Sequence, residues 1–403
     1  MSKTIVICSD GTGNSDTGVP SNVKRLYDLI VQEGPRQVGN YDKGVGTEPR
    51  RPGESLVGYW SGHAASLCFG EGVAQNLLEL YTYFVEHYEP DDRVFLFGFS
   101  RGAFTVRALA GLVHVCGLLR PENISQASEA VRLYEGSEDR IVKERRRRGL
   151  PPTFGPDETD HGAMDPEAQE FKARNGQPCA VDFLGLWDTV KAYGWLRPKS
   201  FPALRHNPGV RMVRHAPALD ERRALFQMTG WGDRHPEVKE VWFAGDHSDV
   251  GGGHRDGNSP LADASLRWML GEATQAGLHL NPVKEDDVKQ IAERSAQAPR
   301  AAPNDLWIRS GFIALDCAPR VELDNAVYPP RLHKRVLWMD GARKPGDHVF
   351  GNTVSVHHTV EARLRAGDRR HTAGRLIRCS HASEPGNTIE LRVAHDVEIR
   401  WHT

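Results

Sequence analysis

Short apolar runs alternate with amphipathic stretches along the first half of the chain. Residues 4–8 and 93–98 form nearly continuous apolar runs, which is typical of strands that are buried on both faces of a parallel sheet. Residues 22–32 and 70–88 instead repeat apolar side chains at the spacing of an α-helix. Because strands and helices alternate in this way, the pattern predicts an α/β fold with a doubly wound, mainly parallel sheet.

The alternation continues beyond these segments. Further strands are expected over residues 37–45, 180–187 and 240–245, and further helices over residues 103–118 and 261–276. Residues 121–178 are polar and contain Pro151-Pro152, so we expect a helical insertion that forms a cap or lid.

The pattern of apolar and polar residues changes near residue 321. Alternating apolar and polar positions over residues 335–339, 389–393 and 397–401 are separated by Gly, Pro and Asp turns, which predicts a small antiparallel β appendage. The expected organisation is one large α/β domain over residues 1–320, with the insertion at 121–178, followed by a β-rich C-terminal appendage over residues 321–403.

Composition and charge argue against several classes of protein. The 403 residues are 39% hydrophobic and 26% charged, with a formal net charge of −2, which is typical of a soluble globular protein and gives no sign of nucleic-acid binding. The run Arg145-Arg146-Arg147-Arg148 is expected to be a solvated helix face rather than a phosphate or lipid contact. The six cysteines are scattered without a C-x-x-C pair, which argues against zinc sites and a disulfide framework.

The chain carries no recognisable membrane or export signal. No apolar run approaches the ~20 residues that a membrane-spanning helix needs, and the first residues lack the layout of a signal peptide. A cytoplasmic location is the default expectation, with secretion by a signal-peptide-independent route as the alternative.

A candidate nucleophile lies between a predicted strand and a predicted helix. The segment Gly98-Phe99-Ser100-Arg101-Gly102 matches the G-x-S-x-G elbow, in which a sharp turn exposes a serine hydroxyl above the end of a strand. Glycines on both sides allow this turn to approach its neighbours closely, and the helix that follows directs backbone N–H groups toward the reacting carbonyl. The alternative is a serine in an ordinary strand–helix turn.

Two later strand ends supply partners for Ser100. The run at residues 181–187 ends at Asp188, and the run at 241–245 leads into His247. In α/β hydrolases the nucleophile, the acid and the base follow in this chain order, so we expect His247 to take the Ser100 proton and Asp188 to orient His247. Both residues have structural alternatives, as a helix N-cap and as a loop histidine. His254 and His358 are rival bases, and Asp249 is a rival carboxylate.

A second glycine-containing loop follows the first predicted strand. In the expected topology, the N–H group of Gly11 or Thr12 joins the N–H of Arg101 in an oxyanion hole. A plain Asp-Gly turn and a phosphate-cradling loop are the alternatives, but the chain has neither a Walker lysine nor a G-x-G-x-x-G pattern. The rim of the site is expected to include Asp10, Asn14, Asp249 and His254.

Several segments together resemble one known family. They are Asp10-Gly11-Thr12-Gly13-Asn14, Ser21-Asn22-Val23, Gly44-Val45-Gly46-Thr47, Gly98-Phe99-Ser100-Arg101-Gly102-Ala103-Phe104, Leu186-Trp187-Asp188-Thr189-Val190, Asp220-Glu221-Arg222-Arg223 and Trp242-Phe243-Ala244-Gly245-Asp246-His247-Ser248-Asp249-Val250-Gly251-Gly252-Gly253. Over about residues 3–275, the chain resembles the α/β-hydrolase domain of the type VI secretion phospholipase effectors, formerly a domain of unknown function.

The resemblance implies an α/β-hydrolase fold, a triad on Ser100, Asp188 and His247, and cleavage of fatty-acyl esters of glycerophospholipids. Two departures concern the rim: the family usually has an aromatic residue in place of Gly13 and a tyrosine in place of His254. A late segment, Val356-His357-His358-Thr359-Val360, also looks like a family motif and implies that His357 or His358 lies near the core.

The expected function is a lipase-type or phospholipase-like serine esterase that requires no metal or organic cofactor. Its expected partners are a small-molecule ester or phospholipid substrate, with a secretion-system or immunity protein as a further candidate. Two other functions remain open. One is metal-assisted phosphoester hydrolysis, with a cation held by Asp10, Asp246, His247, Asp249 and His254. The other is a non-catalytic binding module on the same fold.

Overall fold

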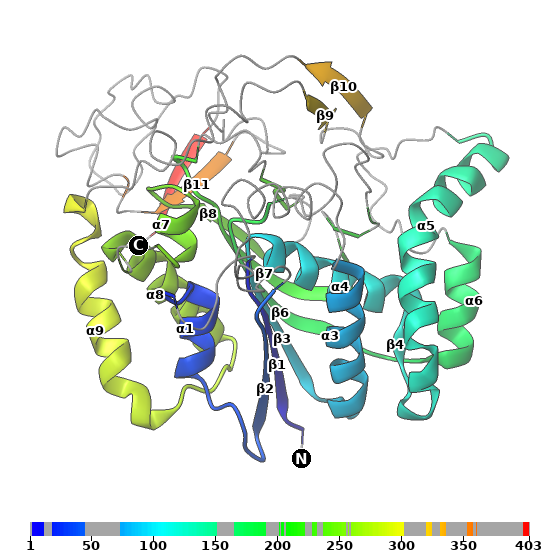
Figure 1. Ribbon diagram of the computed structural model, residues 1–403, viewed down its shortest axis with the longest axis horizontal. Coiled ribbons are helices and arrows are strands. Elements are labelled where there is room, and N and C mark those ends of the chain that lie inside the picture. Colours follow the sequence, from blue (N-terminus) through cyan, green and yellow to red (C-terminus); the bar gives the residue numbers. More distant parts are fainter. Residues whose placement is uncertain are drawn as a thin grey trace, which may run out of the picture.

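A parallel sheet between two layers of helices forms the centre of the computed structural model (Figure 1). The structure describes residues 2–11, 18–44, 73–150, 165–190, 201, 203–204, 207–221, 228–231, 237–254, 257, 259–301, 320–324, 331–335, 353–357, 360 and 398–402. No helix among these residues is both long enough and apolar enough to cross a membrane.

Among the described residues the sheet contains eight strands, and neighbouring strands pair in parallel. In spatial order they are β2 (Gln37–Asp42), β1 (Thr4–Ser9), β3 (Arg93–Phe99), β6 (Val181–Trp187), β7 (Val210–Ala216), β8 (Val238–Trp242), β11 (Thr353–His357) and β12 (Glu398–His402). The chain runs outward from β1 to β2 and then returns to the other side of β1 as β3. This reversal is a topological switch point, and ligands of open α/β sheets bind beside the carboxyl ends of strands at such a point.

Each face of the sheet packs against its own set of helices. On β1, Ile5 and Ile7 face one hydrophobic core, whereas Val6 and Cys8 face the other. The first core includes residues of α3 (Val73–His87), α4 (Arg101–Cys116), α5 (Ala127–Arg147) and α6 (Pro166–Asn175). The second includes residues of α1 (Asn22–Leu29), α8 (Pro260–Gln275) and α9 (Glu285–Ser295). Figure 1 shows these two helical layers on opposite sides of the sheet.

Local signals explain where the helices begin. The Ser21 side chain accepts a hydrogen bond from the amide of Lys24 and caps α1, and Ser259 caps α8 in the same way ahead of Pro260. Every residue of α4 except His114 is buried, in agreement with the continuous apolar pattern that predicted this helix. The strands and helices predicted up to residue 276 are confirmed in type, with bounds that differ by a few residues.

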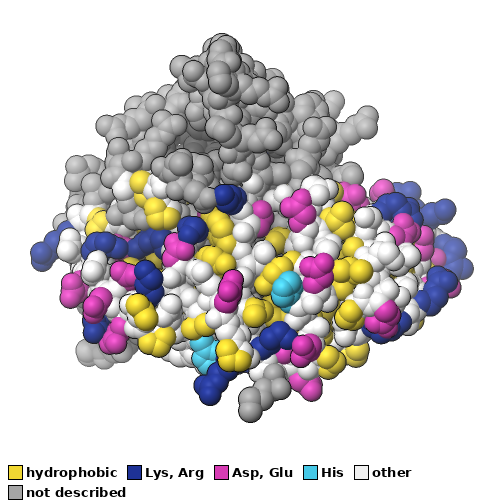
Figure 2. All heavy atoms as spheres, turned by 60° about the horizontal axis from the view of Figure 1, so that its bottom comes forward, with side chains coloured by type: hydrophobic (Ala, Val, Ile, Leu, Met, Phe, Trp, Pro, Cys, Tyr) yellow, Lys and Arg dark blue, Asp and Glu magenta, His cyan; other side chains and the backbone are white. Residues whose placement is uncertain are grey.

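The polar insertion contains the predicted helical pieces. Following a short strand, β4 (Leu118–Leu119), and a 3₁₀ turn, η1 (Pro121–Gln126), α5 and α6 pack against α4, and a second short strand, β5 (Gly176–Gln177), pairs with β4. Residues 151–164 of the insertion lie outside the described part, and its role as a lid stays a prediction. At the end of α5, Arg147 and Arg148 are exposed and paired with Glu144, as expected of a solvated face, but Arg145 is buried. Figure 2 shows basic and acidic side chains intermixed at the end of the molecule that α5 and α6 form.

The structure differs from the sequence predictions in two respects: one strand was missed, and one strand pairs differently from the expectation. Strand β7 was not predicted, because Val210–Ala216 contains two arginines and a histidine that break the apolar run. The run at residues 397–401 was expected in an antiparallel appendage, but β12 pairs in parallel with β11, which extends the main sheet beside β8. An antiparallel pair does occur nearby, between β9 (Arg320–Asp324) and β10 (Arg331–Arg335). The predicted strand at 389–393 lies outside the described residues, and the domain boundary at 320 stays a prediction.

Candidate active site

Ser100 lies in a strained turn between β3 and α4. Its φ of 59° and ψ of −122° are rare for a residue with a side chain, and its hydroxyl does not cap the helix that it begins. The amide of Ser100 donates to the carbonyl of Trp187 at 3.1 Å, and the amide of Val190 donates to the carbonyl of Ser100 at 3.4 Å. Residues on both sides of Asp188 therefore hold this turn in place.

The two glycines of the elbow are required by close backbone contacts. A Cβ atom on Gly102 would lie 2.1 Å from the carbonyl oxygen of Ser9, and one on Gly98 would lie 2.5 Å from the Cα of Ala103. Both contacts are far shorter than packed atoms allow. The pattern Gly-x-Ser-x-Gly thus lets α4 start directly against the end of β1.

Asp188 and His247 form a buried pair. The His247 Nδ1 lies 2.5 Å from Asp188 Oδ2, and the second carboxylate oxygen accepts a hydrogen bond from the amide of Ala218 at 2.8 Å. Asp188 is fully buried and His247 is nearly so. Because an ionised carboxylate only accepts, Nδ1 carries the hydrogen, and the proton-accepting lone pair of the neutral ring is on Nε2.

His247 occupies the first position of a short helix, α7 (His247–Gly251), rather than a loop. Asp246 caps this helix, and the side chain of Asp249 reaches back to the amide of Asp246 in a capping box. The rival carboxylate Asp249 is therefore part of the cap that orients His247. The imidazole ring lies 4.5 Å, between centroids, from the ring of Phe99, the residue directly before Ser100.

The other predicted histidines have different surroundings. His254 is buried, and its place at the rim of the site stays a prediction, whereas His358 lies outside the described residues. The ring of His357 stacks on Phe243 with a centroid distance of 4.4 Å, which confirms the expectation that this motif contacts the core. Within the described part of the chain, no group of three or more His, Cys, Asp or Glu side chains is arranged to hold a metal ion.

The loop after β1 lies beside Ser100, as predicted. A Cβ atom on Gly11 would be 3.0 Å from the Cβ of Ser100. The amide of Gly11 nevertheless donates to its neighbour Asp10 at 2.6 Å, and the Asp10 carboxylate also accepts from Ser21 and Tyr41. Asp10 is thus a buried organiser of the loop rather than a rim residue, and Gly11 does not present its hydrogen to the site in this arrangement. Thr12 and Asn14 lie outside the described residues.

Arg101 contributes a backbone amide and a buried cation. As the first residue of α4, its amide has no acceptor within the helix, in keeping with the predicted oxyanion role. Its side chain is only 6% exposed. Removal from water lowers the pKa of the guanidinium to about 9, so the group remains positively charged at neutral pH.

Sequence reasoning missed a second histidine–carboxylate pair behind Asp188. His215, at the end of β7, is fully buried, with its Nδ1 2.8 Å from Glu240 Oε2. Its Nε2 accepts a hydrogen bond from the amide of Thr189 at 3.3 Å. Since β7 was not recognised, no signal placed His215 at this edge of the sheet.

Comparison with known families identifies one match. The profile of the family described as "T6SS, Phospholipase effector Tle1-like, catalytic domain" matches residues 3–272. The chain belongs to this family. Membership implies a lipolytic hydrolase and confirms the resemblance seen in the sequence.

Similarity to individual proteins is more distant. An uncharacterized protein of Saccharomyces cerevisiae, YEL023C, is 30% identical over 236 residues, which is 56% of this chain and 32% of that protein. The chain thus spans about a third of that relative's length. A crystal structure of an uncharacterized protein from Pseudomonas aeruginosa has 19% identity and a TM-score of 0.42, covering 76% of this chain and 52% of that one. The Tle1 effector, in a structure bound to the VgrG spike of the type 6 secretion system, has 18% identity and a TM-score of 0.30, covering 63% and 52%.

Proposed function

We propose that the protein is a serine hydrolase of the α/β-hydrolase type that cleaves carboxylic esters of phospholipids through an acyl-enzyme. The observation that carries the proposal is the buried Asp188–His247 pair, whose imidazole packs against the residue preceding the strained Ser100. Family membership supports the phospholipid substrate.

In this mechanism the Ser100 hydroxyl attacks the acyl carbonyl and gives its proton to Nε2 of His247. Asp188 keeps the hydrogen on Nδ1 and stabilises the imidazolium that forms. The imidazolium then protonates the leaving alcohol. In the second half, a water molecule gives a proton to His247 and attacks the acyl-serine, which releases the fatty acid and restores the serine.

The oxyanion of each tetrahedral intermediate requires hydrogen-bond donors. The Arg101 amide is one donor, supported by its position at the start of the sixteen-residue helix α4. The Gly11 amide becomes a second donor only if its hydrogen turns from Asp10 to the substrate. The strained backbone of Ser100 is consistent with a nucleophile that the fold holds at the end of its strand.

The first test is labelling of the intact protein with a fluorophosphonate probe, followed by peptide mapping. We expect the label on Ser100 in the wild-type protein and none in Ser100→Ala. Ser128→Ala, which changes an exposed serine of α5, is the matched control and should label normally. Absence of labelling in the folded wild-type protein, or equal labelling of Ser100→Ala, would contradict the triad mechanism.

Activity of triad variants is the second test. Ser100→Ala, His247→Ala and Asp188→Asn should reduce ester hydrolysis by about 10⁴- to 10⁶-fold while the proteins remain folded. His279→Ala serves as the control for His247, because it removes an exposed histidine near the amino-terminal ends of β1 and β3. Full activity in His247→Ala would reassign the base to His254 or His358. Substrates should include para-nitrophenyl esters of increasing chain length beside defined phospholipids, so that acyl preference is measured at the same time.

A further inference from the structure

Arg101 differs from three other buried arginines of the described chain. Arg25 pairs with Asp263, Arg214 pairs with Glu272, and Arg107 donates to the carbonyl oxygens of Leu204, Thr229 and Gly230. No described residue forms a hydrogen bond or an ion pair with the Arg101 guanidinium, although the residue is only 6% exposed. A buried charge without a partner is unfavourable, so a fold that keeps one usually presents it to a ligand.

Arg101 lies next to the candidate nucleophile in the chain. Arg101 directly follows Ser100 and is the first residue of α4, where the helix dipole and unpaired amides also favour an anion. Burial lowers the pKa of its guanidinium, and no carboxylate among the described residues pairs with it. The chain thus places a buried cation directly after the candidate nucleophile.

Unpaired polar atoms in the adjoining segment provide a second observation. The hydroxyls of Thr189 and Thr229 are buried, and neither has a hydrogen-bond partner among the residues that the structure describes. These two residues are joined by a backbone hydrogen bond of 2.9 Å, and Val190, next to Thr189, bonds to the carbonyl of Ser100. Buried polar atoms in proteins are normally paired, so unsatisfied hydroxyls on the segment that bonds to the Ser100 backbone are consistent with a polar ligand group.

We propose that the Arg101 guanidinium binds the phosphodiester of a glycerophospholipid while Ser100 attacks one of its acyl esters. This inference rests on the proposed function and deepens it by naming the residue that selects an anionic substrate. The planar guanidinium fits a phosphodiester because it can donate two parallel hydrogen bonds to two phosphate oxygens. The phosphodiester and the acyl esters are carried by the same glycerol unit, so one substrate can occupy both groups.

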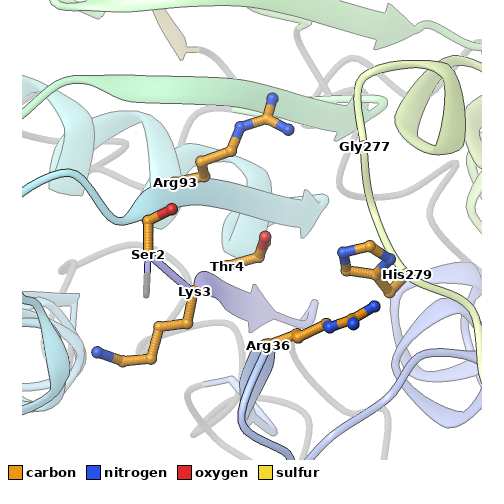
Figure 3. A pocket seen from close by; sticks show the side chains of 7 residues that line it. All are labelled: Ser2, Lys3, Thr4, Arg36, Arg93, Gly277 and His279. Carbon is orange, nitrogen blue, oxygen red and sulfur yellow. The ribbon is translucent and has the colours of Figure 1, made fainter.

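The experiment compares two substrates with identical acyl chains, dioctanoyl phosphatidylglycerol and neutral dioctanoylglycerol. The ratio of their kcat/KM values is measured for the wild type, for Arg101→Met and for Arg101→Lys. Arg36→Met is the matched control, because it removes one positive charge from an exposed residue just before β2. Arg36 lines a basic depression with Lys3, Arg93 and His279 at the amino-terminal ends of the strands, the opposite edge from Ser100 (Figure 3).

We expect Arg101→Met to lower the anionic-to-neutral ratio by roughly 10- to 100-fold, the effect of losing hydrogen bonds to a charged group. Arg101→Lys should retain part of the ratio, because it keeps the charge but loses the paired geometry. Arg36→Met should leave the ratio unchanged. A ratio within twofold of wild type in folded Arg101→Met would overturn the proposal, and so would an equal loss in Arg36→Met, which would move anion recognition to the basic depression.

A measurement on the wild-type protein covers the case in which Arg101→Met does not fold. Hydrolysis of a neutral para-nitrophenyl ester should be inhibited competitively by sn-glycerol 3-phosphate at concentrations where glycerol has no effect. Inhibition by octanoate instead would assign the cation to the fatty-acid carboxylate and overturn the phosphodiester proposal. If the wild type labels at Ser100 and hydrolyses both esters but shows none of these effects, only this inference fails. If it neither labels nor hydrolyses any ester, the proposed function fails.

Discussion

At the scale of single residues, the candidate site depends on a strained serine and on backbone contacts so close that they leave no space for a Cβ atom. Ser100 adopts a positive φ, and the backbone of Gly102 lies directly against the end of β1. The Ser100 conformation is unfavourable in isolation, so the packing of β1, β3 and α4 must enforce it. The glycines are therefore needed for steric reasons that are independent of the chemistry at the serine.

The first prediction concerns Gly102→Ala. Its new Cβ would fall 2.1 Å from the Ser9 oxygen and 2.5 Å from the Asp10 oxygen, both of them backbone atoms that cannot rotate away. We expect a loss of about 1–3 kcal/mol in the free energy of unfolding, measured by urea titration, together with reduced esterase activity.

Gly271→Ala is the matched control for this substitution. Gly271 lies within α8, and a Cβ there would meet no atom within 4 Å. Replacing a helical glycine by alanine should stabilise the protein by about 0.5–1 kcal/mol. Equal effects of the two substitutions would show that close packing at Gly102 is not the constraint.

At the scale of elements, the end of β7 fixes the segment that carries Asp188. The amide of Asp188 donates to Ala216, the Asp188 carboxylate accepts from Ala218, and the next amide, that of Thr189, donates to His215. His215 in turn is held by Glu240 on β8. The position of the candidate carboxylate is therefore set by two neighbouring strands rather than by its own turn.

The second prediction tests this support through Glu240→Leu. Glu240 Oε2 accepts hydrogen bonds from the ring of His215 and from the amide of Trp231. Without it these buried groups lose an acceptor, which should cost about 1–3 kcal/mol of stability and lower kcat. Urea titration and steady-state kinetics give the two readouts.

A nearby glutamate provides the comparison. Glu237 has a side chain that is 59% exposed and an ion pair of 4.0 Å to Arg214, so Glu237→Leu should change stability by less than about 1 kcal/mol. If Glu240 holds the segment that carries Asp188 through His215, only the Glu240 variant should lose activity. A Glu240→Leu protein with wild-type stability and kcat would contradict it.

At the scale of the whole molecule, two separate cores on the faces of the sheet share the same strands. Cys8 of β1 belongs to one core, and Cys116 at the end of α4 belongs to the other. Because β1 and its neighbours contribute to both cores, opening one face disturbs the other. We therefore expect the described α/β unit to unfold cooperatively.

The third prediction follows from the chemistry of these thiols. Burial raises the pKa of Cys8 and Cys116 well above that of a free thiol, and it raises the pKa of Cys179 to about 12. The reactive thiolate is thus depleted at pH 8 in the folded state, and reaction with iodoacetamide should be slow. Mass spectrometry across a urea titration should show Cys8 and Cys116 becoming labelled together at the unfolding midpoint. Labelling of one of them well below that midpoint would show that the two cores unfold separately.

Much of the fold could be predicted because its signal is local. The strands β1, β3 and β6 are continuous apolar runs, and α1 and α8 begin at serine caps, so both type and approximate position could be inferred. Strand β7 was not predicted from the sequence, because its charged and polar side chains find their partners only in the folded chain. Arg214 pairs with Glu272, and His215 pairs with Glu240. The parallel pairing of β12 likewise depends on residues distant in sequence.

Neighbouring residues and contiguous patterns in the sequence were enough to predict most strands and helices, the glycine-flanked turn at Ser100 and the membership of a lipolytic family. Individual contacts became visible only in the folded chain: Asp188 meets His247 while Asp249 takes part in the cap of α7, the Gly11 amide bonds to Asp10, and Arg101 is buried without a described partner. The physical reason is that hydrogen bonds and desolvation depend on three-dimensional neighbours, which in these cases come from strands separated by long stretches of chain.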